Sequence, residues 1–131
     1  TNMRYDSIQR GTEEIGGKSV SYRSKWECNW AYYLEWLKQQ GEIKEWEYEP
    51  ERYYFYITEG NTKIQIGTYL PDFRITKNDG TQYIDELKGY RQGMRKIQRM
   101  RKHYPHIPVN LIDSAQYNTI KRQIGKLLNW I

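Results

Sequence analysis

The sequence predicts an α/β sandwich around a mixed sheet, formed by a single domain of 131 residues. Apolar residues recur at helical spacing in three segments and alternate with polar residues in several shorter ones. The order along the chain is helix, several strands, helix, strand, helix, which is typical of an α/β arrangement. A chain of this length can bury one hydrophobic core, and no internal repeat or linker divides it.

The N-terminal segment and the first helix are distinguished by their periodicity. Residues 1–21 contain three glycines and no sustained periodicity, so we expect a partly ordered arm ahead of a domain over residues 22–131. The first helix is expected over residues 21–40, since Trp30 and Leu34 begin an apolar stripe at helical spacing.

The start of this helix carries an acid that has two interpretations. Ser24 and Glu27 fit the capping-box pattern, in which a glutamate three residues after a serine caps the helix. In the alternative, Glu27 is an acidic residue that faces a functional site near the helix start. The pattern alone favours the cap.

Strands are expected from residue 43 onward. Residues 43–48, 53–57 and 63–66 show the alternation of half-buried strands. Residues 69–88 then predict a hairpin, because Asn78-Asp79-Gly80 is a strong turn signal between two strand-like runs.

The C-terminal third predicts a second helix, a short strand and a last helix. The second helix covers residues 91–103 and ends before Pro105. A buried strand follows at residues 107–112, and the last helix is expected over residues 115–130 with Leu127 on its buried side.

Composition limits the classes of function. The net charge of +5 and pI near 9.2 favour an anionic partner, of which nucleic acid is the commonest. Cys28 is the only cysteine, which excludes an internal disulfide framework and a cysteine-rich zinc site. No long apolar run is present and the N-terminus is polar, so we expect no membrane span, no signal peptide and a cytoplasmic protein.

The hairpin over residues 69–88 brings three polar residues together. Glu86 and Lys88 project to one side of their strand, and strand pairing places Asp72 beside them. Two carboxylates, with the backbone carbonyl of Leu87, form an oxygen ligand set for Mg²⁺. Lys88 would orient a water or stabilise developing negative charge, so the group predicts phosphodiester hydrolysis. Asp85 points to the opposite face and is left out of this site.

The motifs in this order resemble the PD-(D/E)XK nuclease superfamily. The resemblance lies in Arg23-Ser24-x-x-Glu27, Leu-Pro-Asp-Phe ending at residue 73, and Ile-Asp-Glu-Leu-Lys ending at residue 88. The same arrangement of motifs is similar to that of small phage-encoded endonucleases, archaeal-type Holliday junction resolvases and the nuclease subunit of heteromeric transposases. The resemblance implies a restriction-endonuclease-like α-β-β-β-α-β sandwich with an extra C-terminal helix.

The resemblance also assigns roles to individual residues. Asp72 and Glu86 would be metal ligands and Lys88 the catalytic lysine. Glu27 would be a fourth catalytic residue that helps to bind or organise the metal. The metal would be Mg²⁺, with Mn²⁺ as a substitute.

A basic flank follows the hairpin. From Arg91 onward nine Lys and Arg residues face one acid, Asp113, whereas a solvated helix face normally mixes both signs. This enrichment favours a surface for the DNA backbone. The candidate DNA-binding residues are Arg23, Lys25, Arg91, Arg95, Lys96, Arg99 and Lys102.

The sequence therefore predicts a metal-dependent DNA endonuclease, with a structure-selective Holliday junction resolvase of phage type as the first hypothesis. Its partner would be branched or four-way DNA, in the host cytoplasm if the chain is phage-encoded. Paired symmetrical cuts would require a homodimer, since one small chain holds one site. Two alternatives stay open: a nicking or transposon-end nuclease with a separate DNA-recognition partner, and a catalytically inactive DNA-binding module.

Overall fold

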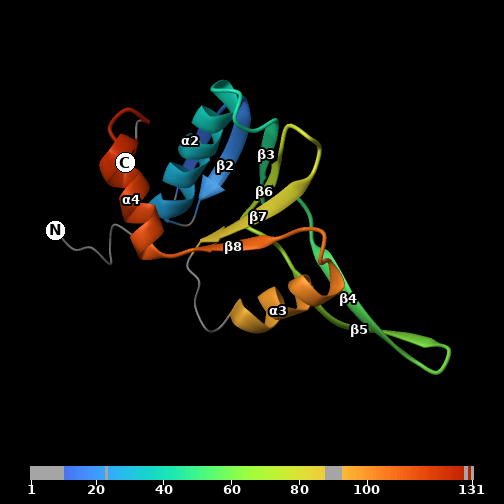
Figure 1. The fold of residues 1–131 in the computed structure, drawn as a ribbon. Helices are drawn as coiled ribbons and strands as arrows, with labels where there is room; N and C mark the ends of the chain where they lie inside the picture. Colours follow the sequence, from blue (N-terminus) through green and yellow to red (C-terminus); the bar gives the residue numbers. More distant parts are fainter. Residues whose placement is uncertain (1–10, 23, 88–92, 129, 131) are drawn as a thin grey trace.

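A computed structural model describes residues 11–22, 24–87, 93–128 and 130 of the chain. Within these residues the fold is mixed α/β, with three helices and a mixed multistranded sheet, as predicted (Figure 1). None of the described helices is long and apolar enough to cross a membrane.

The central sheet has four strands in the order β3-β6-β7-β8. They are β3 (Glu45–Tyr48), β6 (Phe73–Thr76), β7 (Gln82–Leu87) and β8 (Val109–Ile112). β3 pairs with β6 and β6 pairs with β7, both antiparallel, whereas β7 and β8 are parallel. A parallel pair needs a crossover connection, and here the connection contains a helix.

The predicted hairpin is formed by β6 and β7. The Gly80 N–H donates to the Lys77 carbonyl oxygen at 2.9 Å, and Gly80 has a φ of 89°, which explains the glycine in this turn. Phe73 pairs with Asp85, so Asp72, one residue before β6, lies level with Glu86. The sequence placed Asp72 on the strand itself, but the structure places it just ahead of the strand.

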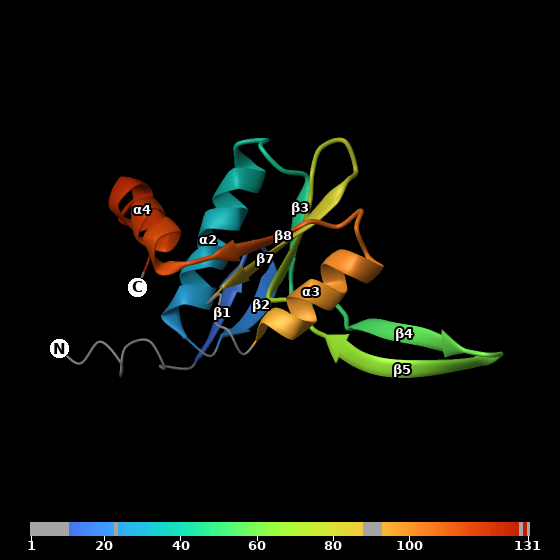
Figure 2. The same cartoon turned by 60° about the horizontal axis from the view of Figure 1, so that its bottom comes forward.

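The helices cover both faces of this sheet (Figures 1 and 2). Helix α2 (Lys25–Gln39) and helix α4 (Ser114–Ile124) lie on one face, over a core that contains Trp46 and Phe73. Helix α3 (Met94–His103) lies on the other face, where Ile97 packs in a second core. The sheet thus separates two cores.

The N-terminal segment differs from the predicted arm. From Gly11 onward it is a β-hairpin of β1 (Gly11–Ile15) and β2 (Lys18–Tyr22), whose inward residues join the α2 core. Gly16 and Gly17 form its two-residue turn with φ values of 59° and 80°. A side chain at Gly16 would also collide with Glu35 of α2. Residues 1–10 of the predicted arm lie outside the described residues.

A second hairpin, β4 (Tyr53–Glu59) with β5 (Thr62–Tyr69), extends away from the body of the molecule (Figures 1 and 2). Its base packs under α3, where Phe55 is fully buried. Its outer half exposes Tyr56 and Ile57. We call residues 53–69 the projecting hairpin.

Two helix boundaries also differ from the predicted ones. Helix α2 begins at Lys25 rather than at residue 21, because Ser24 has extended backbone angles. Helix α4 ends at Ile124 rather than at residue 130, and Leu127, predicted to be buried, is 69% exposed.

Candidate active site

Asp72 and Glu86 hold each other in place at the end of the β6–β7 hairpin. The Asp72 N–H donates to Glu86 Oε1 at 3.1 Å, and the Leu87 N–H donates to Asp72 Oδ2 at 2.9 Å. Each carboxylate therefore accepts a hydrogen bond from the backbone beside the other. The Asp72 carbonyl oxygen is itself held by the Glu49 N–H at 2.8 Å, so this segment is anchored to the chain that follows β3.

Tyr69 is a further partner of Glu86, and the sequence did not identify it. Its hydroxyl donates to Glu86 Oε1 at 2.5 Å. Burial raises the pKa of Glu86, and the charge of Glu27 adds to this effect. The Tyr69 hydroxyl, the Asp72 N–H and the positive charge of Lys96 act in the opposite direction. The site thus balances desolvation of Glu86 against several groups that favour its charged form.

Glu27 does not form the capping box that its spacing suggested. Ser24 is the N-cap residue of α2, but its side chain makes no capping hydrogen bond. Among the described residues, the buried Ser24 Oγ has no hydrogen-bond partner. Glu27 is instead 2% exposed, and its Oε1 lies 2.7 Å from the Tyr48 hydroxyl. The capping interpretation is therefore wrong, and a buried carboxylate replaces it.

Tyr48 connects Glu27 electrostatically to the carboxylate pair. Burial raises the pKa of Tyr48, and the charges of Glu27, Glu49 and Asp72 raise it further. Glu27 in turn affects the pKa of Glu86. Glu27 therefore acts electrostatically on Glu86, and Glu27 and Asp72 both act on Tyr48.

The donor set of the pair suits a hard divalent cation. Asp72 and Glu86 offer carboxylate oxygens, and Mg²⁺ binds in proteins through one or two carboxylates together with water and substrate oxygens. Both of the hydrogen bonds described for Glu86 are accepted by its Oε1 atom. As the side chains stand, no three His, Cys, Asp or Glu residues within the described ranges form a metal-binding group.

Three of the predicted functional residues, Lys88, Arg23 and Arg91, lie outside the described residues. The other basic candidates are described. Lys25 is half-buried in the first turn of α2. The remaining four belong to α3 and are Arg95, Lys96, Arg99 and Lys102.

The four basic residues of α3 differ in their surroundings. Lys96 is exposed and close enough to Glu86 to lower its pKa. Arg99 is half-buried, with its guanidinium against Gly67 of β5. Arg95 and Lys102 are exposed. Lys96 therefore acts electrostatically on Glu86 of the carboxylate pair.

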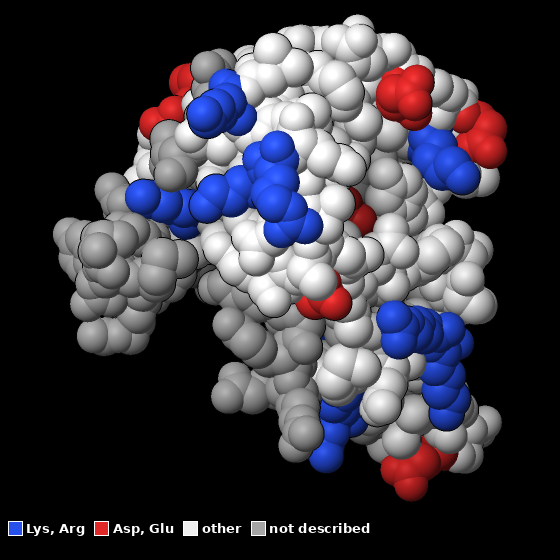
Figure 3. Space-filling model, turned by 60° about the vertical axis from the view of Figure 1, so that its left-hand side comes forward, with Lys and Arg blue, Asp and Glu red and all other residues white. Residues whose placement is uncertain are grey.

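The basic residues of the C-terminal third are divided between the two faces of the sheet. Those of α3 lie on the Glu86 face, whereas Lys121 and Arg122 belong to α4 on the opposite face. Figure 3 shows Lys and Arg side chains in several separate groups on one side of the molecule. The prediction of one continuous basic surface is therefore wrong for the described residues, because α3 and α4 lie on opposite faces of the sheet.

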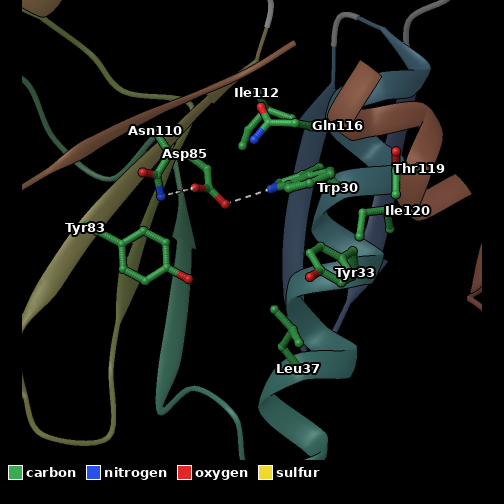
Figure 4. Close-up of a pocket in the computed structure, with 10 residues that line it drawn as sticks. All are labelled: Trp30, Tyr33, Leu37, Tyr83, Asp85, Asn110, Ile112, Gln116, Thr119 and Ile120. Carbon is green, nitrogen blue, oxygen red and sulfur yellow. Dashed lines mark hydrogen bonds between the residues drawn. The ribbon is translucent and has the colours of Figure 1, made fainter. Parts of the chain in front are cut away.

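Asp85 lies on the face opposite Glu86, as strand alternation predicted. Its carboxylate accepts hydrogen bonds from Trp30 Nε1 at 2.9 Å and Asn110 Nδ2 at 3.2 Å (Figure 4). Burial raises the pKa of Asp85, and these two bonds act against that rise. The sequence did not reveal that Asp85 lines a pocket, since that depends on how α2 and α4 pack on the sheet.

Comparison with protein families gives a match over most of the chain. Residues 9–119 match a family model described as "Protein of unknown function (DUF1064)". No curated protein and no solved structure matches the chain. The match covers most of the chain, including both carboxylates of the pair and Glu27.

Proposed function

We propose that this chain, which belongs to the DUF1064 family of proteins of unknown function, is a metal-dependent DNA endonuclease. The proposal rests on the reciprocal hydrogen bonds that hold Asp72 and Glu86 together beside Leu87. This arrangement presents carboxylate oxygens at one end of a sheet, next to a helix with basic side chains and no acid in its sequence.

The order of elements supports the same proposal. Without the projecting hairpin, the chain runs α2-β3-β6-β7-α3-β8, and the strands lie in the sheet in that order. This resembles the α-β-β-β-α-β core of PD-(D/E)XK nucleases, with β1–β2 and the projecting hairpin as additions and α4 as the extra C-terminal helix. In that comparison Asp72 and Glu86 lie at the motif positions.

In the proposed reaction Mg²⁺, held by Asp72, Glu86 and the Leu87 carbonyl, would activate the attacking water and neutralise charge on the phosphate. The protein's own residues set up this chemistry. Tyr69 and the Asp72 N–H fix the orientation of Glu86. Lys96 supplies positive charge beside the pair, where a scissile phosphate would bind. By resemblance, Lys88 would orient the water or stabilise the developing charge.

The proposed substrate is branched DNA, with a four-way junction as the first candidate. The sequence contains no motif that reads bases, so recognition through DNA shape is more consistent with the chain than recognition of a sequence. Symmetrical incision of a junction requires two equal sites, and we propose that a homodimer supplies them.

The test is a cleavage assay with Mg²⁺ or Mn²⁺ on a labelled four-way junction, linear duplex, flap and single strand. Paired, symmetrical incisions in the junction are expected. Equal cutting of every duplex would contradict junction selectivity but not nuclease activity. A nick confined to one strand would favour the nicking enzyme. Absence of cutting on all four substrates with both metals would contradict the endonuclease proposal and favour a binding module.

A further inference from the structure

A pocket of about 390 Å³ lies on the face of the sheet opposite Glu86, between α2, α4 and the strands β7 and β8 (Figure 4). In Figure 4 the hydroxyls of Tyr33 and Tyr83 point toward one another from the helix and from the sheet. Its volume is within the range of protein sites for small molecules, roughly 300–1,000 Å³. The proposed nuclease reaction makes no use of this pocket.

Asp85 is the carboxyl group of this pocket. It is 5% exposed, and its two oxygens accept hydrogen bonds from Trp30 Nε1 and Asn110 Nδ2. Both donors are neutral, and each carboxylate oxygen can accept a further hydrogen bond. Buried carboxylates are ordinarily paired with a cation. Among the described residues that line the pocket there is no Lys, Arg or His, so the protein itself provides no such cation there.

The walls beside Asp85 are aromatic. Trp30, Tyr33 and Tyr83 all line the pocket, and the rings of Trp30 and Tyr33 have centroids 4.9 Å apart with a tilt of 58°. Aromatic faces attract cations through their quadrupole. A planar, delocalised cation both stacks on such rings and forms paired hydrogen bonds with a carboxylate, which a compact ammonium group cannot do.

We propose that this pocket binds a planar cation of the guanidinium or amidinium class, with Asp85 as its charge partner. Asn110, Gln116 and Thr119 offer polar groups to the rest of such a ligand. The ligand chemistry has two possible sources: a free small molecule, or an arginine side chain of a protein partner. Phosphate groups do not fit, because no described cation lines the pocket.

The test uses the full chain and ligands that differ in one property at a time. Benzamidine is a planar cation, and benzamide is its neutral analogue of nearly equal shape. Isothermal titration calorimetry and ligand-observed NMR are expected to show saturable binding of benzamidine, with benzamide at least tenfold weaker. Agmatine and N-acetylarginine amide distinguish the sources: tighter binding of the first indicates a free small molecule, and tighter binding of the second indicates a protein side chain.

Variants connect the binding to this pocket. Asp85→Asn is expected to weaken benzamidine at least tenfold, whereas Glu59→Gln at the tip of the projecting hairpin leaves it unchanged. If circular dichroism shows that Asp85→Asn does not fold, Thr119→Tyr provides the test, because its larger side chain would obstruct the pocket and leave Asp85 intact.

Three results would overturn the proposal. They are equal affinity for benzamide, unchanged benzamidine affinity in a folded Asp85→Asn or Thr119→Tyr variant, and failure of both agmatine and N-acetylarginine amide to bind. Tighter binding of neutral guanosine than of benzamidine would also overturn it, in favour of a nucleobase site. None of these readouts depends on nuclease activity.

Discussion

Asp85 and Glu86 are consecutive residues of β7, and their carboxyl groups lie on opposite faces of the sheet with different partners. Asp85 accepts hydrogen bonds from Trp30 and Asn110, and Glu86 accepts them from Tyr69 and the Asp72 N–H. Strand alternation predicted this separation because its period is two residues. The partners come from α2, β8 and β5, and alternation within one strand carries no information about them.

The Tyr69 hydroxyl is predicted to favour the charged form of Glu86. Tyr69→Phe removes a hydrogen bond that lowers the pKa of Glu86, so this pKa, already raised by burial, rises further. The acidic limb of the pH–rate profile should therefore move to higher pH. Cleavage at the acidic end should fall about tenfold, as expected for loss of a hydrogen bond to a charged group.

The matched control for this prediction is Tyr54→Phe, which removes the hydroxyl of an exposed tyrosine on the projecting hairpin. Its pH–rate profile should coincide with that of the wild type. A Tyr69→Phe profile that also coincides with the wild type would contradict the role given to Tyr69.

At the scale of elements, the sequence predicted the long periodic segments and the β6–β7 hairpin, and it missed the β1–β2 hairpin. A strand with one buried face is indicated in the sequence by alternating apolar residues, and a hairpin turn is indicated by Asn, Asp and Gly. Gly16-Gly17 between Ile15 and Lys18 was such a signal, with alternating residues on either side. Each strand has only five residues, which is too short an alternation to distinguish the hairpin from a loop that contains glycine. The capping box failed for another reason: Tyr48, 21 residues away in sequence, binds Glu27.

The β1–β2 hairpin is predicted to contribute to stability, in contrast to the outer half of the projecting hairpin. Ile15 is buried in the α2 core, and Ile57 is exposed. Ile15→Ala should lower the free energy of unfolding by about 2–5 kcal/mol, the usual cost for a buried isoleucine. Ile57→Ala should change it by no more than about 0.5 kcal/mol. Urea denaturation checks both, and equal costs would contradict the docked hairpin.

Glu45 links β1–β2 and α2 to the sheet, and this link is predicted to depend on pH. Its Oε1 lies 2.9 Å from Lys18 Nζ and 3.1 Å from Lys38 Nζ. Burial alone would raise the pKa of Glu45, but hydrogen bonds from Lys18, the Trp46 N–H and Lys38 lower it to about 2. The folded-state pKa is thus below the unfolded value of about 4.3, so the stabilisation is present above that value and is lost toward pH 2.

The corresponding variant is Glu45→Gln. The Glu45 side chain is 41% exposed, so solvent screening limits the expected loss in the free energy of unfolding to about 0.5–1 kcal/mol at pH 7. The difference from wild type in urea denaturation should disappear near pH 2. A loss that is the same at pH 7 and pH 2 would show that the charge of Glu45 is not its cause.

For the molecule as a whole, the described basic residues of the C-terminal third lie on both faces of the sheet. Helix α3 brings its cations to the face of the carboxylate pair, whereas those of α4 lie on the other face. The sequence could not show this division, because the connection β7-α3-β8 and the return through α4 place consecutive basic segments on opposite sides (Figures 1 and 2).

DNA binding is predicted to depend on the cations of α3 rather than on those of α4. The double variant Lys96→Gln with Lys102→Gln should lower the slope of log K against log salt by about two, as expected for two lost phosphate contacts. The matched double variant Lys121→Gln with Arg122→Gln should leave the slope within about 0.5 of the wild-type value. Fluorescence anisotropy with a labelled junction provides the measurement. Equal slopes in the two variants would contradict the proposed orientation of the DNA.

The central claim is that Asp72 and Glu86 form the metal site of a nuclease. The most direct test measures Mg²⁺-dependent DNA cleavage by the Glu86→Gln variant, with Glu59→Gln as the control. Both changes remove one negative charge, the first in the carboxylate pair and the second at the tip of the projecting hairpin. We predict that Glu86→Gln abolishes cleavage while DNA affinity without metal stays near that of the wild type, and that Glu59→Gln cleaves normally. Retained cleavage by Glu86→Gln would contradict the account.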